Sequence, residues 1–184
     1  MHRFQYNETD RLKIQNPKEI LNTISLKEGD IFIDIGSNNG FFSIPAAEIV
    51  GKKGQVYAID IDELAILNLQ ERLKDKGIFN VETFVSRGED FLKDDIKADI
   101  VFLGTVLHDF QDPIKVLKNS FSMLKDSGKI VNFDWKKKKT QLGPPLNIRL
   151  SEMQSEKMLK EAGFSSIRIE DISENFYQIT AGKN

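Results

Sequence analysis

The sequence predicts a single α/β domain built on a doubly wound, mostly parallel sheet. Short apolar runs alternate with amphipathic stretches along most of the chain, which is the pattern of successive βαβ units. The run 31–35 passes through a glycine-containing turn directly into an apolar helical pattern, and the run 55–60 ends in an acidic residue. Such units align the carboxyl ends of their strands along one edge of the sheet, where ligands bind.

The expected elements follow from apolar periodicity, turn residues and capping residues. Asp112 before Pro113 is an N-cap and first-position pair, and Ser151 with Gln154 forms a capping box. Strands are expected at 31–35, 55–60, 81–85, 98–104, 129–134, 167–170 and 176–180. Helices are expected at 17–24, 40–50, 63–76, 113–125 and 152–162.

We divide the single domain, 1–184, into three parts. Residues 1–28 form an N-terminal arm and helix, and the polar stretch 1–15 is expected to fold over the site. Residues 29–134 form the ligand-binding core of the sheet. Residues 135–184 supply a loop on the side of the second substrate, a helix and the last two strands.

Composition describes an ordinary globular protein without a nucleic-acid signature. A chain of 184 residues suits one domain with a sizeable core. Lysine plus arginine number 26 and aspartate plus glutamate 28, so the net charge is 26 − 28 = −2 and no basic excess indicates a DNA partner. The absence of cysteine excludes disulfides, thiolate zinc sites and cysteine nucleophiles, and only two histidines are present. We therefore expect no metal site.

The hydropathy pattern indicates no membrane segment. No apolar run reaches the roughly 18 residues that a membrane-spanning helix needs. The N-terminal stretch Met1–Tyr6 lacks the apolar core of a signal peptide. We therefore expect a cytoplasmic protein with no membrane partner.

The turn after the first strand indicates a bound ligand. Gly36 and Gly40 flank small polar residues, and the following helix would direct backbone N–H groups and its dipole at an anionic group. Asp60 closes the next strand, at the position where doubly wound sheets hold ribose hydroxyls. Together these features indicate an adenosine ligand and leave NAD and S-adenosylmethionine open.

Two details favour S-adenosylmethionine over NAD. The glycines are spaced G-x-x-x-G, whereas the dinucleotide fingerprint is G-x-G-x-x-G, whose second glycine admits the pyrophosphate. Asp34, two residues before Gly36, would face the pocket with its carboxylate. An acid there repels a pyrophosphate but suits a ligand that carries an ammonium and a sulfonium.

The block Asp34-x-Gly36-x-x-x-Gly40 followed by Asp60 resembles motifs I and II of the class I S-adenosylmethionine-dependent methyltransferases. Asn38 stands where that family commonly has a middle glycine, and asparagine tolerates the left-handed backbone that such a turn needs. The resemblance implies a Rossmann-like fold whose seven-stranded, mostly parallel sheet has an antiparallel last strand. It also implies S-adenosylmethionine as cofactor, with S-adenosylhomocysteine as product.

The resemblance assigns parts of the cofactor to numbered residues. Asp34 and the loop Gly36–Gly40, with Ser37 and Asn38, would hold the methionine end, and Asp60 the ribose. Further candidates follow the second, third and fourth strands. They are Ile61 against the adenine, Gly88 or Glu89 near its exocyclic amine, and Gly104 in the same crevice. For Gly88 and Glu89, a solvated acidic loop is an equally good interpretation.

The segment 106–113 indicates which class of acceptor is methylated. It resembles the Leu-His-x-x-x-Asp-Pro pattern of ubiquinone/menaquinone C-methyltransferases and related small-molecule enzymes, and it lacks the Asn/Asp-Pro-Pro-Tyr turn of DNA amino-methyltransferases. His108 could remove a proton from the acceptor or hold it by a hydrogen bond. The alternative is a structural histidine packed under the loop. An arsenite methyltransferase is disfavoured because the chain has no cysteine.

Three functions remain open from the sequence. The preferred one is methyl transfer to a small-molecule acceptor by direct in-line displacement, and the others are an RNA or protein methyltransferase and a non-catalytic module that binds an adenosine ligand. Trp135 and Arg149 are candidate acceptor-pocket residues by position, whereas Lys136–Lys139 is interpreted as a solvated face. Because little chain remains to enclose an acceptor, the pocket is either open or completed by a second subunit in a homodimer.

Overall fold

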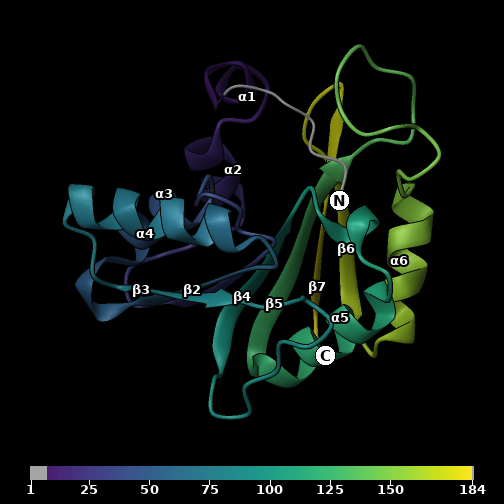
Figure 1. Ribbon diagram of the computed structural model, residues 1–184. Helices are drawn as coiled ribbons and strands as arrows, with labels where there is room; N and C mark the ends of the chain where they lie inside the picture. Colours follow the sequence, from purple (N-terminus) through teal and green to yellow (C-terminus); the bar gives the residue numbers. More distant parts are fainter. Residues whose placement is uncertain (1–7, 184) are drawn as a thin grey trace.

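A computed structural model describes residues 8–183. One seven-stranded sheet, in the order β3-β2-β1-β4-β5-β7-β6, forms its centre (Figure 1). Strand β7 runs antiparallel to both of its neighbours, and the other pairs are parallel, so the predicted fold class is confirmed. The strands are β1 (Ile31–Ile35), β2 (Gln55–Asp60), β3 (Val81–Val85), β4 (Ala98–Gly104), β5 (Leu124–Trp135), β6 (Ser165–Asp171) and β7 (Phe176–Gly182).

Helices cover both faces of the sheet, because the central strands direct apolar side chains to each face. Phe32 of β1 faces a core cluster with α2, α3 and residues of β4 and β5. Its neighbour Ile33 faces a second cluster with α5 and α6. The described helices are α1 (Glu8–Ile14), α2 (Pro17–Thr23), α3 (Ser43–Val50), α4 (Glu63–Lys76), α5 (Pro113–Met123) and α6 (Glu152–Glu161), with short 3-10 turns η1 (Gly51–Lys53) and η2 (Leu107–Asp109).

Local signals located most boundaries. Strands 31–35, 55–60, 81–85 and 98–104 agree with the predicted ranges, and so does α4. Asp62 caps α4 by accepting from two backbone N–H groups, and Gly77 ends it in the left-handed region at φ 65°. The capping box of Ser151 and Gln154 begins α6. Side-chain capping and turn chemistry therefore set these ends as expected.

The end of α5 was predicted wrongly. The helix stops at Met123 instead of reaching 125, and β5 begins at Leu124 rather than at 129. Leu124 is fully buried and pairs with Ala98 ahead of an irregularity in the β4–β5 register. Burial of this leucine in the sheet overrides the helical pattern that its sequence neighbours suggest.

The N-terminal helix α1 was not predicted. Only Leu12 and Ile14 of its seven residues are apolar and none is fully buried, so its sequence shows no apolar face that periodicity could reveal. Figure 1 shows α1 at the same end of the molecule as the loop that follows β5. The first seven residues of the predicted arm lie outside the described part of the chain. Within residues 8–183, no helix is both long and apolar enough to cross a membrane.

Candidate active site

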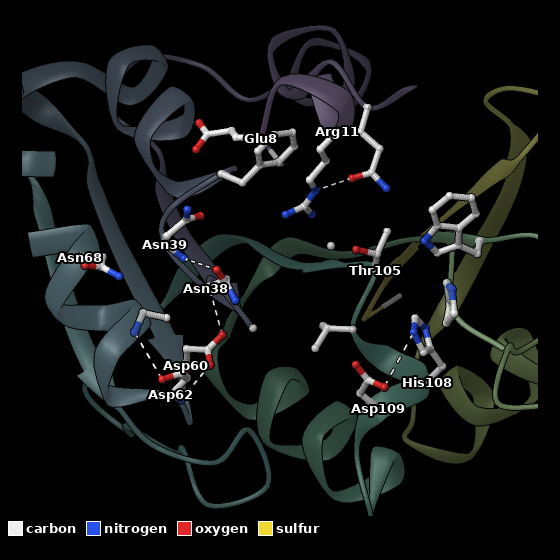
Figure 2. A pocket seen from close by; sticks show the side chains of 18 of the residues that line it. Glu8, Arg11, Asn38, Asn39, Asp60, Asp62, Asn68, Thr105, His108 and Asp109 are labelled. Atoms are coloured by element: carbon white, nitrogen blue, oxygen red, sulfur yellow. Dashed lines mark hydrogen bonds and ion pairs between the residues drawn. The ribbon is translucent and has the colours of Figure 1, made fainter. Parts of the chain in front are cut away.

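Two adjoining cavities lie at the carboxyl ends of the parallel strands. The larger, of about 500 Å³, is bounded by α1, the loop after β1, the start of α4 and the turn η2. The smaller, of about 130 Å³, lies between the segments that follow β2, β3 and η2. Four residues line both cavities: Gly36, Asp60, Val106 and Asp109. Figure 2 shows Asp60 and Asp62 on one side of the larger cavity and His108 with Asp109 on the opposite side.

The loop after β1 is shaped by its first glycine. Gly36 has φ +83°, and a Cβ on it would lie 2.6 Å from Cγ2 of Val106. The backbone N–H groups of Gly36 and Ser37 donate to the carbonyl of Ile59, at 2.8 and 2.9 Å. Asn38 has φ 49°, so asparagine does take the left-handed conformation expected of it. Glycine at position 36 thereby allows the side chain of Val106 to lie directly against the loop.

Asp60 connects this loop to α4. Its side chain is 2% exposed and lines both cavities. One carboxylate oxygen accepts from the backbone N–H of Asn38 at 2.8 Å, and the other accepts from that of Asp62 at 2.9 Å. Each carboxylate oxygen can accept more than one hydrogen bond, so this fixed group can also receive two neighbouring hydroxyls of a ligand.

Asp34, Ser37 and Gly40 do not line either cavity. The carboxylate of Asp34 is enclosed and accepts a 2.5 Å hydrogen bond from the hydroxyl of Ser43, so it does not face an open pocket as the sequence suggested. Ser37 is buried, and its hydroxyl has no hydrogen-bond partner in the described structure. A Cβ on Gly40 would clash with Leu69 of α4, which makes this glycine a requirement of helix packing.

The environment of Asp34 makes it a titratable group near neutral pH. Burial raises the pKa of this carboxyl, the hydrogen bond from Ser43 lowers it and the charge of Asp60 raises it again, with a net value of about 7. The charge of Arg11 lowers this pKa slightly. A buried acid of this kind favours a cation as its neighbour above pH 7.

Replacing Asp34 with asparagine is expected to change the pH dependence of stability. The folded pKa lies above the unfolded value of about 4, so ionisation destabilises the wild-type fold progressively as the pH rises from about 4 to about 7. From about pH 4 to pH 8, the stability of Asp34→Asn relative to wild type should therefore rise by about 2–4 kcal/mol. Urea unfolding of both ligand-free proteins at several pH values measures this difference, and a pH-independent difference would contradict it.

The smaller cavity brings together the candidates that follow β2 and β3. Ile61, Gly88 and Glu89 all line it, and Ile61 is 51% exposed. A Cβ on Gly88 would lie 2.7 Å from Cε1 of Phe110, so the backbone can lie this close to the ring only with glycine at position 88. Glu89 is buried and accepts from the backbone N–H of Gln111 at 2.9 Å. Glu89 is therefore not part of a solvated loop. Its carboxylate is also already engaged, so it is not freely available to accept from the exocyclic amine of an adenine.

His108 is held by a carboxylate from the neighbouring strand. Its Nδ1 lies 2.9 Å from both side-chain oxygens of Asp134, at the end of β5, and its side chain is 4% exposed. Parallel pairing of Gly104 with Phe133 brings the ends of β4 and β5 together, and Gly104 and His108 both line the larger cavity. Nε2 of His108 lies 3.9 Å from Oδ1 of Asp109.

The two acids determine the protonation of His108. Burial lowers the pKa of the imidazole, but the charge and hydrogen bond of Asp134 raise it, with a smaller rise from Asp109, so the net pKa lies above its ordinary value. Because a carboxylate only accepts, the neutral ring carries its proton on Nδ1 and donates it to Asp134. Nε2 then holds a lone pair that can accept a proton.

The two other acceptor-pocket candidates differ in position. Trp135 lines the larger cavity, as expected. Arg149 does not line it; its guanidinium is 5.1 Å from the Trp135 ring and is surrounded by groups of the preceding loop. It donates to the carbonyls of residues 136, 138, 142 and 144 and to the hydroxyl of Thr140. Arg149 therefore holds the loop closed and contacts two residues that line the cavity, Trp135 and Pro144.

The lysine run behaves largely as a solvated face. Lys136 pairs with Asp171 at 2.6 Å and Lys138 with Glu174 at 3.5 Å, while Lys137 and Lys139 are exposed. None of the four lines a cavity. Other polar residues of the larger cavity, outside the predicted loop Gly36–Gly40, were not among the sequence candidates: Glu8, Arg11, Gln15, Asp62, Asn68, Thr105 and Asp109. Among these residues, only Asp62 has a recognisable local sequence signal, as the N-cap of α4.

Comparison with known proteins identifies the family. A family model described as a methyltransferase domain matches residues 26–180. The chain belongs to this methyltransferase family. A crystal structure of an S-adenosylmethionine-dependent methyltransferase from Aquifex aeolicus is similar at 27% identity and TM-score 0.87, over 96% of this chain and 98% of that one. The resemblance stated from the sequence motifs is therefore confirmed, and S-adenosylmethionine is the cofactor that this family implies.

Two curated relatives are similar over part of their length. A demethylmenaquinone methyltransferase from Listeria welshimeri is 25% identical over 67% of this chain and 52% of its own length. A ubiquinone/menaquinone biosynthesis C-methyltransferase from Vibrio vulnificus is 29% identical over 60% of this chain and 43% of its own. The chain thus spans about half the length of the curated relatives that it matches.

Proposed function

We propose that this protein transfers the methyl group of S-adenosylmethionine to a small-molecule acceptor in the larger cavity. The observation that carries the proposal is the His108–Asp134 pair, which lies across one cavity from Asp60 and the Gly36 loop. A candidate proton acceptor and a carboxylate suited to ribose hydroxyls thus line the same cavity. Adenosine would occupy the smaller cavity and the methionine end the larger.

The described residues fit this cofactor. Gly36 lines both cavities without a side chain of its own, and Asp60 presents a fixed carboxylate to both. When bound, S-adenosylmethionine supplies an electrophilic methyl carbon and a good leaving group. The protein's main task is then alignment in an in-line displacement, for which effective molarities of about 10⁵ M or more are known.

His108 is the proposed general base. With Nδ1 donating to Asp134, the Nε2 lone pair can take a proton from a hydroxyl or an acidic carbon of the acceptor as the methyl group is transferred. Asp134 then stabilises the imidazolium, and Asp109 adds negative charge 3.9 Å from Nε2. A thiolate acceptor would need no such base, which makes an oxygen or carbon nucleophile the better fit.

The proposed acceptor is a hydroxylated aromatic ring, methylated at oxygen or at an adjacent carbon. The names of the curated relatives refer to demethylmenaquinone and to ubiquinone/menaquinone biosynthesis, and deprotonating a ring hydroxyl activates both positions. Trp135 supplies an aromatic wall beside His108. The cytoplasmic location, the homodimer and the three-part division of the chain stay predictions from the sequence.

A panel of acceptors tests the proposal. Purified protein with isotopically methyl-labelled S-adenosylmethionine is offered hydroquinones, naphthoquinols and simple phenols, and in parallel total RNA and denatured protein. We expect label in one or more of the aromatic compounds and not in the macromolecules, with His108→Asn as the inactive control. Label confined to RNA or protein would favour that alternative. Binding of the cofactor without turnover of any acceptor would favour the non-catalytic module.

A further inference from the structure

Helix α1 places one cation at the larger cavity. Arg11 lines that cavity, and Figure 2 shows its guanidinium directed into it. The Nε of Arg11 donates to the side-chain oxygen of Gln15 at 2.8 Å. Its central carbon lies 3.9 Å from the ring centroid of Phe41 and 5.6 Å from that of Phe42. One nitrogen and one face of the guanidinium are thus occupied, and its position is set.

The terminal nitrogens of Arg11 have no hydrogen-bond partner within residues 8–183. The two nearby acids are engaged elsewhere: Asp34 accepts from Ser43, and Glu8 pairs with Arg72 at 2.7 Å. Burial lowers the pKa of Arg11 to about 10, against the raising charges of Asp34 and Glu8, and the group remains protonated at neutral pH. A partly buried guanidinium with two parallel N–H donors suits a carboxylate, which it can bind through two hydrogen bonds.

We propose that Arg11 binds the α-carboxylate at the methionine end of S-adenosylmethionine. Phe41, on which the guanidinium lies, directly follows the Gly36–Gly40 loop, and the charge of Asp34 at the start of that loop acts on Arg11. The cation therefore stands over the loop that the proposed placement assigns to the methionine end. It stands apart from His108, which borders the acceptor space (Figure 2). The inference rests on that placement of the cofactor.

Contacts with α4 and with the core hold α1 in this position. Arg72 of α4 pairs with Glu8 and also donates to the carbonyl of Asn39 in the glycine loop, at 2.9 Å. No residue of α1 is fully buried, and the helix is attached by these contacts, the stacking of Arg11 and the partly buried Ile14. A bound carboxylate would add another attachment between α1 and the cofactor. Removal of the Arg11 charge therefore leaves the core of the fold untouched.

Calorimetry with two nucleosides tests the assignment. The probes are S-adenosylhomocysteine and its decarboxylated analogue, which keeps the amine and lacks the carboxylate. We expect Arg11→Gln to weaken S-adenosylhomocysteine binding by roughly 10- to 100-fold and to change the affinity for the analogue by less than about twofold. Arg11→Lys, which keeps the charge but lacks the two parallel N–H donors, should have an intermediate affinity for S-adenosylhomocysteine. Lys13→Gln, on the exposed side of the same helix, is the matched control and should bind both probes as wild type does.

Three results would overturn the assignment. An equal loss of affinity for both probes in Arg11→Gln would make Arg11 a support of α1 and not a carboxylate ligand. Unchanged S-adenosylhomocysteine binding, with a raised KM for an acidic acceptor, would assign the guanidinium to the acceptor. Failure of the wild-type protein to bind either probe would contradict the cofactor placement itself, and is thereby distinguishable from the first two results.

Discussion

His108→Asn is expected to lower kcat by about 10²- to 10⁴-fold, the range in which a positioned general base contributes. Asparagine can still donate to Asp134 from a nitrogen near the place of Nδ1, but it offers no basic atom in the place of Nε2. S-adenosylhomocysteine affinity should stay within about twofold of wild type, because His108 lies across the cavity from Asp60. Single-turnover methyl transfer measures the loss, and a rate within threefold of wild type would make His108 a structural residue.

The pH profile of Asp134→Asn provides an independent measure of the same base. Burial lowers the pKa of His108, whereas the charge of Asp134 raises it above the ordinary value. Activity should therefore rise with pH as the imidazolium loses its proton, and the acid limb of kcat/KM should move to lower pH when the Asp134 charge is removed. A profile that does not move would show that another group controls the rate.

Asp60→Ala is expected to weaken S-adenosylmethionine and S-adenosylhomocysteine binding by about 100-fold or more, since a hydrogen bond to a charged group contributes about 1.5–3 kcal/mol. The substitution removes the acceptor of the proposed ribose contacts and also frees the backbone N–H groups of Asn38 and Asp62. Asp60→Asn, which keeps one acceptor oxygen, should lose less. Calorimetry measures both affinities.

Glu63→Gln is the matched control for Asp60, because Glu63 is exposed in the first turn of α4 and lines neither cavity. Its affinity for both nucleosides should equal that of wild type. Thermal unfolding of all variants separates a lost contact from a lost fold. Micromolar binding that survives Asp60→Ala in a folded protein would exclude this carboxylate as the ribose ligand.

The positions of most strands and of the ribose-binding candidate could be derived from the chain alone. The apolar run before Gly36 and the run that ends in Asp60 can be recognised from short stretches of sequence. A buried parallel strand, a turn and a helix cap each depend mainly on residues close together in the chain. The β5 boundary was wrong for the converse reason, since Leu124 is held in the sheet by pairing with a residue distant in sequence.

The composition of the cavity could not be derived in this way. Arg11 reaches it from a helix without buried residues, Asp134 acts on His108 because two parallel strands end side by side, and Asp34 turns away toward Ser43. Arg149, a candidate by position, instead holds the loop after β5 closed. Short-range chemistry thus determines the elements and the family motif, whereas the partners and the protonation of the site residues depend on packing between distant segments, which leaves no periodic signal in the sequence.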